Sequence, residues 1–113
     1  MRDDRERLSD MLEAIHKIEQ YIHDESGQIA SQESELVEVW VVHHLQIIGE
    51  AASRISNELR EKYPEVAWGG MIGMRHVLVH GYFETDTEIV WKVAQNDLPT
   101  LKVQIQKILT DLK

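Results

Sequence analysis

The stretch VEVWVVHHLQIIGEAA, residues 37–52, is apolar on more than one face when it is arranged as a helix. Its candidates for burial are Trp40, Val41, Leu45, Ile48 and Ala52. A helix of this kind lies at the centre of its bundle or is shared with a second subunit. We therefore expect a central helix from Ser34 to Tyr63 that ends at Pro64, because proline cannot continue a helix.

The segments on either side also show helical spacing. Apolar residues three and four apart predict a first helix from Asp4 to His23, namely Leu8, Met11, Leu12, Ile15, Ile18 and Ile22. Trp68-Gly69-Gly70 is expected to be a loop, followed by a third helix over Met71–Phe83.

The last third of the chain predicts two more helices. Thr85 and Glu88 have capping-box spacing at the start of a fourth helix. Pro99 should kink or restart the chain before a last helix over Leu101–Leu112. No useful period-two stretch occurs, so the sequence predicts an all-α fold. We expect one domain, residues 1–113, folded as an up-and-down bundle of four main helices plus a short C-terminal helix after the proline kink.

Composition excludes several classes of function. The chain has no cysteine, so thiolate nucleophiles and zinc-thiolate sites are absent. Its net charge of -8 argues against gripping nucleic acid over the whole surface, and is equally compatible with a basic partner. The N-terminal MRDDRERLSD lacks an apolar secretory core, and no apolar run approaches the roughly 20 residues that span a bilayer. A cytoplasmic protein with no membrane association is expected.

The segment Arg75-His76-Val77-Leu78-Val79-His80-Gly81-Tyr82 concentrates the reactive side chains. Arg75 falls beside the apolar face of the third helix, and a partly buried guanidinium needs an anionic partner. That anion could be the carboxylate of Glu50 or the phosphate of a ligand. His80 lies one residue before Gly81, where helix-end carbonyls raise an imidazole pKa and suit it to proton transfer near neutral pH.

Arg75 and His80 do not converge on one regular helix. They are five residues apart, which is about 140° around an ideal helix. They can meet if the helix end unwinds, or if two copies of the segment face each other in a homodimer. We prefer the dimer, because it also accounts for the strongly apolar central helix.

Two other interpretations of these histidines are open. Taken alone, a helical arginine and two histidines are more often surface or satisfied core groups. His76 and His80 have the i, i+4 spacing of metal ligands, but no acidic third ligand is near them in the sequence, so we expect no metal and no cofactor. The adjacent His43 and His44 point to different faces, which is poor geometry for chelation.

Several blocks together resemble a known family. Residues 74–82, MRHVLVHGY, resemble the Arg-polar-x4–6-His motif of HEPN domains and, more closely, the Arg-x4-His-x-Tyr form of HepT-like toxins. Residues 45–51, 63–68, 89–91 and 96–99 are similar to other parts of that family in the same order. The resemblance covers nearly the whole chain.

This resemblance implies a HEPN-like helical bundle that dimerises and cleaves RNA without a metal, the ribose 2′-hydroxyl attacking the adjacent phosphate. By position, Arg75 would neutralise the phosphate and His80 would move the proton. His76 stands where the family often has asparagine, and Glu50 lies in the similar part of the second helix. His43-His44 replace a frequent Arg-Asn, which removes a fixed positive charge.

The resemblance also implies a partner. HepT-like toxins are paired with a minimal nucleotidyltransferase antitoxin, which can adenylylate the motif tyrosine, here Tyr82. Bulk and negative charge at that hydroxyl would repel substrate phosphate. The leading hypothesis is therefore a type II ribonuclease toxin with an RNA substrate. The alternatives are a catalytically weak HEPN module that binds a nucleotide or a partner, and a structural helical adaptor.

Overall fold

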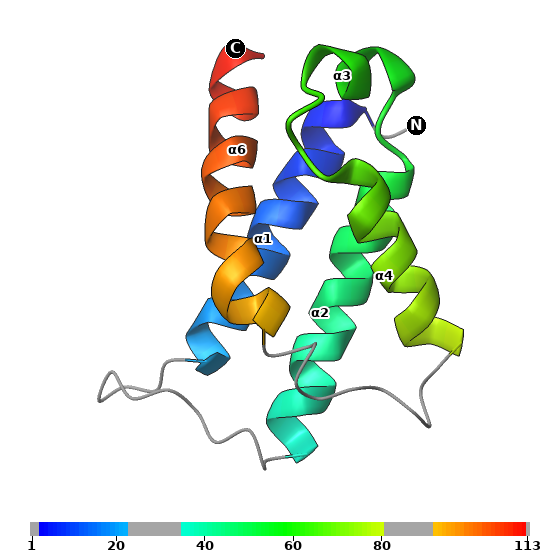
Figure 1. Ribbon diagram of the computed structural model, residues 1–113. Helices are drawn as coiled ribbons and strands as arrows, with labels where there is room; N and C mark the ends of the chain where they lie inside the picture. The colour runs from blue at the N-terminus through cyan, green and yellow to red at the C-terminus, as the bar shows by residue number, and fades with distance from the viewer. Residues whose placement is uncertain (1–2, 23–34, 81–91, 113) are drawn as a thin grey trace.

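The computed structural model describes residues 3–22, 35–80 and 92–112, and within these ranges it describes no side chain for residues 21–22, 35–38, 75–80 and 94. Every regular element in these ranges is helical: α1 (Asp4–Ile22), α2 (Glu35–Ser53), α3 (Asn57–Lys62), α4 (Trp68–His80), η1 (Val93–Asp97) and α6 (Leu98–Asp111). α1 packs between α2 and α6, while α4 packs on α2 (Figure 1). The long helices alternate in direction, which confirms the predicted all-α bundle.

The core lies where the long helices meet. It takes one stripe from each helix and contains, among others, Leu8, Met11, Ile15, Ile18, Val41, Ile48, Ile105 and Ile108, each at most 2% exposed. α1 starts at Asp4, as predicted, because the Asp3 carboxylate accepts a hydrogen bond from the Glu6 backbone N–H at 2.9 Å. No helix within the described ranges has the length and apolarity that a membrane span requires.

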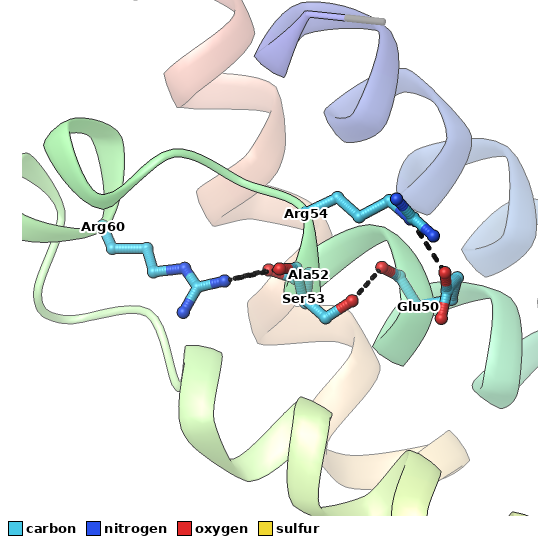
Figure 2. A network of polar contacts seen from close by, with 5 residues as sticks. All are labelled: Glu50, Ala52, Ser53, Arg54 and Arg60. Carbon is cyan, nitrogen blue, oxygen red and sulfur yellow. Dashed lines mark hydrogen bonds and ion pairs between the residues drawn. The ribbon is translucent and has the colours of Figure 1, made fainter.

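The predicted single helix over Ser34–Tyr63 is wrong, because the chain breaks at residues 54–56. Ser56 starts α3 as its N-cap, with extended backbone and its hydroxyl accepting from Leu59 N–H at 3.2 Å. The Asp4 carboxylate of α1 accepts hydrogen bonds from Ser56 N–H at 2.9 Å and from its hydroxyl at 2.6 Å. Arg60 donates to the last carbonyls of α2, those of Ala52 at 2.9 Å and Ser53 at 3.0 Å (Figure 2).

The predicted loop at Trp68-Gly69-Gly70 is also wrong, since these residues form the first turn of α4. Trp68 is buried, and its indole N–H donates to the Tyr63 carbonyl at 3.0 Å, which fixes the helix start. Met71 N–H then bonds to the Ala67 carbonyl at 3.1 Å, so the helical ladder begins one turn early. The anchoring tryptophan outweighs the low helix propensity of the two glycines.

A new α-helix begins at the proline, as predicted, because α6 starts at Leu98 and has Pro99 in its first turn. The chain enters α6 at Leu98 directly from the π-helical turn η1, and the Leu98 N–H bonds to the Val93 carbonyl five residues back. Proline lacks an N–H and its ring crowds the carbonyl four residues earlier. The wider π turn accommodates both problems while the chain stays helical. Of the predicted fourth helix, residues 85–91 lie outside the described ranges.

The two ends of the described chain meet at one end of the bundle (Figure 1). The Arg5 guanidinium donates to the Leu112 carbonyl at 2.6 Å. The Tyr63 hydroxyl donates to the Asp111 carboxylate at 2.9 Å. These contacts tie the start of α1 and the end of α3 to the C-terminus of α6.

Candidate active site

The motif residues Arg75, His76 and His80 all lie on α4. The backbone of this helix is described through His80, its final residue, whereas the three side chains, Gly81 and Tyr82 lie outside the description. The backbone is helical from residue 75 to residue 80. Arg75 and His80 therefore stay about 140° apart around the helix axis.

The described part of α4 shows which of its faces are already occupied. Met71 and Met74 pack against the core and line a cavity of 440 Å³ between α2, α4 and α6. Gly69 and Gly73 are exposed, and a Cβ built on either would meet nothing within 4 Å. At about 100° per residue, His80 falls on the same face of α4 as these two glycines. That face is thus open along its described length.

The Glu50 carboxylate on α2 is neither buried nor unpaired, so it does not require Arg75 as an ion-pair partner. Its side chain is 40% exposed, and its carboxylate accepts from Arg54 Nε at 2.8 Å (Figure 2). The pairing of Glu50 with Arg75 stays a prediction, because the Arg75 side chain lies outside the description. The sequence contained a signal for Arg54, namely a glutamate followed four residues later by an arginine on one helix.

Arg60 is a second residue that sequence reasoning did not single out. It supplies the positive charge that the last turn of α2 lacks, and bonds to two of its terminal carbonyls. No local pattern marks this role, because the contact depends on the turn between α2 and α3. Arg54 and Arg60 together fix the end of α2 just beyond Glu50.

His43 and His44 have different surroundings. His43 is exposed, whereas His44 is only 5% exposed and its Nδ1 lies 2.8 Å from the Trp40 carbonyl, to which it donates. Burial lowers the pKa of His44 below its ordinary value of 6.5; the Trp40 bond and Glu13 oppose this shift, and His43 and Lys17 add to it. Burial therefore favours the neutral form of the His44 ring.

Metal binding finds no support among the described side chains. No group of three histidine, aspartate or glutamate residues in that part of the chain is arranged to hold an ion. The His76 and His80 side chains are not part of it, so the absence of a metal at the motif stays a prediction.

Comparison with known proteins identifies the family. The model described as "HepT-like: Ribonuclease HepT-like" matches residues 11–108, which include α4 and the core of α1, α2 and α6. The chain belongs to the HepT-like ribonuclease family. This confirms the resemblance seen in the sequence. It also confirms the predicted enzyme class, ribonuclease.

Named relatives agree with the family model. A Methanocaldococcus jannaschii protein named "Putative RNase MJ1380" is 33% identical over 106 residues, 93% of this chain and 95% of its own. "Probable ribonuclease HepT" of Thermococcus cleftensis is 32% identical over 109 residues, 95% and 96% of the two chains. A third, "Gamma-glutamylcyclotransferase and putative RNase MJ0434" of M. jannaschii, is 35% identical over 105 residues, 93% of this chain and 47% of its own. No solved structure matches the chain.

Proposed function

We propose that this chain is a single HEPN-like domain that acts in the cytoplasm as a metal-independent endoribonuclease. It is the toxin of a type II toxin–antitoxin pair. The observation that carries the proposal is the HepT-like ribonuclease match over residues 11–108, in which the motif residues Arg75 and His80 are held on one packed helix. Similarity to proteins named as RNases over nearly their whole length supports it.

The proposed chemistry needs only groups of the chain and of the RNA. His80 takes the proton from a ribose 2′-hydroxyl, whose oxygen forms a bond to the adjacent phosphorus. The bond from phosphorus to the 5′-oxygen breaks, leaving a 2′,3′-cyclic phosphate, and the protonated His80 gives its proton to the 5′-oxygen. Arg75 neutralises the charge that develops on the non-bridging oxygens. His76 and Glu50 support the position of these two groups.

We propose further that the site is shared between two subunits. The helical backbone through His80 does not bring Arg75 and His80 together, so unwinding of the helix end finds no support. Two copies of α4 facing each other across a twofold axis would place the arginine of one near the histidine of the other. The open face at Gly69 and Gly73 leaves room for such an approach.

The proposed antitoxin is a minimal nucleotidyltransferase that binds the dimer. It transfers an adenylyl group from ATP to the Tyr82 hydroxyl and releases pyrophosphate. The added phosphodiester places negative charge two residues from His80 and repels the RNA backbone. The net charge of -8 suits a basic surface on this partner.

Expression of the chain alone tests the toxin activity. Growth should arrest, and purified protein should cleave RNA in the presence of EDTA. Both effects should disappear in His80→Ala and in Arg75→Ala. The matched control is His16→Ala, which removes an exposed histidine of α1 and should leave cleavage unchanged. Growth arrest that survives His80→Ala contradicts the catalytic assignment.

Complementation tests the shared site. Arg75→Ala and His80→Ala subunits, each inactive alone, form a mixed dimer in which one composite pair has both side chains. Cleavage should therefore return when the two variants are co-expressed, to about half of the wild-type level per mixed dimer. Mixed dimers that form but stay inactive rule out a site built from both subunits.

Intact mass tests the antitoxin. Protein co-expressed with the nucleotidyltransferase encoded beside it should gain the mass of one or more adenylyl groups, and Tyr82→Phe should not. Adenylyl groups that persist in Tyr82→Phe place the modification elsewhere.

One observation favours the second candidate, a catalytically weak HEPN module that binds a nucleotide or a partner. His43, which stands where the family often has arginine, is exposed and carries an imidazole in place of the permanent positive charge of a guanidinium. This module would bind the nucleotidyltransferase without cleaving RNA, so the cleavage assay separates the two functions.

A further inference from the structure

The cavity of 440 Å³ between α2, α4 and α6 has no role in the proposed RNA-cleaving chemistry. Its floor is apolar and consists mainly of Leu45, Ile48, Met71, Met74, Leu98 and Leu101. The leucine and isoleucine side chains are buried, whereas Ala67, Gly70 and Thr100 at the edges are exposed, so the cavity opens to solvent. Because α4 and α6 form its two sides (Figure 1), we call it the α4–α6 groove.

The charged groups of the α4–α6 groove are acidic and lie at its rim. Glu65 precedes α4 and Asp97 ends η1, and both residues are exposed. None of the described residues that line the groove is basic. In the described part of the chain, no ion pair involves either carboxylate. Two carboxylates beside an apolar floor favour a partner that presents apolar and positively charged side chains together.

The two carboxylates are about two helical turns apart along α6. The Gln104 side-chain amide donates to the Glu65 carbonyl at 3.4 Å, which places Glu65 beside Gln104. Asp97 precedes Gln104 by seven positions, which corresponds to about 10 Å along one face of the helix. A partner helix that runs along the groove matches this spacing when two basic residues lie two turns apart with an apolar residue between them.

We propose that the α4–α6 groove receives a basic amphipathic helix of the nucleotidyltransferase antitoxin. This inference rests on the proposed function, which supplies the partner. A large apolar side chain of the antitoxin contacts Met71 and Met74, whose flexible side chains adapt to its shape. Lysine or arginine residues one turn to either side of it pair with Glu65 and Asp97. Because Met74 directly precedes Arg75, the bound helix lies beside the motif.

Other occupants match the α4–α6 groove less well. The two carboxylates repel RNA and other anions. A second copy that uses the same surface across a twofold axis would set Glu65 and Asp97 against their equivalents. A small polar ligand would find no polar side chain among the floor residues to orient it.

Calorimetric titration of the full chain with the purified nucleotidyltransferase encoded beside it, without ATP, tests the groove. Thr100→Trp fills the open edge and should weaken binding at least tenfold. Gln106→Trp, its matched control at an exposed position of α6 outside the groove, should stay within twofold of the parent protein. RNA cleavage by either variant alone should equal that of the parent.

A second pair of variants tests the charges. Glu65→Gln combined with Asp97→Asn should weaken binding at least tenfold and reduce its dependence on salt. Glu58→Gln combined with Glu61→Gln on α3 removes the same net charge from exposed positions outside the groove, and should stay within twofold. Circular dichroism identifies any variant that fails to fold. The amide substitutions keep the size of exposed side chains, so they test the groove even if Thr100→Trp is unfolded.

The outcomes separate this inference from the proposed function. A parent chain that does not bind the nucleotidyltransferase refutes the pair, and the inference falls with it. A parent chain that binds, with groove variants within twofold of it, refutes the groove alone. Equal weakening by the Glu58 and Glu61 control reflects net charge and also refutes it. Loss of the dimer in Thr100→Trp, measured by sedimentation, would assign the groove to a second copy instead.

A Thr100→Trp chain that loses stability but keeps its affinity for the nucleotidyltransferase would assign the groove to a segment of the same chain, which again overturns the inference.

Discussion

The break between α2 and α3 makes a prediction whose sign depends on the fold. In the structure, the Ser56 hydroxyl caps α3 by accepting from Leu59 N–H and donates to the Asp4 carboxylate at 2.6 Å. Ser56→Ala removes both contacts. Loss of an N-cap costs about 1 kcal/mol, and loss of an exposed hydrogen bond to a carboxylate adds about 0.5–1 kcal/mol. The free energy of unfolding should therefore fall by about 1.5–2 kcal/mol.

A continuous helix through residue 56 would give the opposite result. In a helix interior alanine is favoured over serine by about 0.5 kcal/mol, so Ser56→Ala would then stabilise the protein. Urea unfolding at one fixed protein concentration measures the difference, because the proposed dimer would make stability depend on concentration. The midpoint of thermal unfolding should fall by about 7 °C for a chain of this length.

Two further variants sharpen the test. Ser9→Ala changes an exposed serine within α1, and should stay within about 0.5 kcal/mol of the parent protein. In a double-mutant cycle, Ser56→Ala and Asp4→Ala should be coupled by at least about 0.5 kcal/mol, because their side chains share a hydrogen bond. An increase in stability for Ser56→Ala, or no coupling with Asp4→Ala, refutes the capped break.

Three further predictions concern single side chains. The pKa of His44 is lowered in the folded protein, so the unfolded chain takes up the proton first as pH falls. The free energy of unfolding should therefore be constant above about pH 7 and decrease below pH 6.5, and it should decrease less in His44→Gln. The same decrease in both proteins contradicts this. The pKa of Tyr63 is raised above 10.0 by its hydrogen bond to Asp111 and by burial, so its stabilising contribution is present below pH 10 and is lost as pH rises above it. Ultraviolet titration should show one tyrosine that ionises at higher pH than the others, and this tyrosine should be missing in Tyr63→Phe. Gly70→Ala should raise the free energy of unfolding by about 0.5–1 kcal/mol, because alanine favours the helix and its methyl would meet only Ala67 Cβ at 3.7 Å, an ordinary contact; a decrease in urea unfolding contradicts this.

The helices with one clear apolar stripe were predictable from the sequence. The spacing of Leu8, Met11, Ile15 and Ile18 predicted α1 from its first residue, and all four are buried. Most of α6 followed from the same pattern. The wide π turn before it did not, because the sequence marks the proline and leaves open how the chain accommodates it.

Two boundaries depended on contacts between distant residues. Apolar spacing continues from Ala52 through Ile55 to Leu59, so no local signal marks the end of α2. The break is stabilised by Asp4, 52 residues away, and by Arg60 on the next helix. Likewise, only the folded position of Trp68 against the Tyr63 carbonyl shows that α4 begins in the glycine-rich segment.

For the candidate site, the sequence predicted residue types and angular spacing, and it could not predict burial. The motif on α4 and the 140° between Arg75 and His80 follow from the order of residues, at about 100° per position. His43 and His44 are neighbours in sequence, and only the position of α1 against α2 decides that His44 is the buried one. The Glu50–Arg54 pair was visible as i, i+4 spacing.

The turn η1 contains one residue more than an α-helix needs for the same hydrogen-bonded turn. Removing a single residue from Val93–Asp97 would convert it to an α turn and rotate the entering residue, Lys92, by about 100° relative to α6. The buried stripe of α6, including Leu101 and Ile105, would keep its place on α1. The length of this turn therefore sets the direction in which Lys92 leads into α6, and a one-residue deletion here should change that direction without unfolding the bundle.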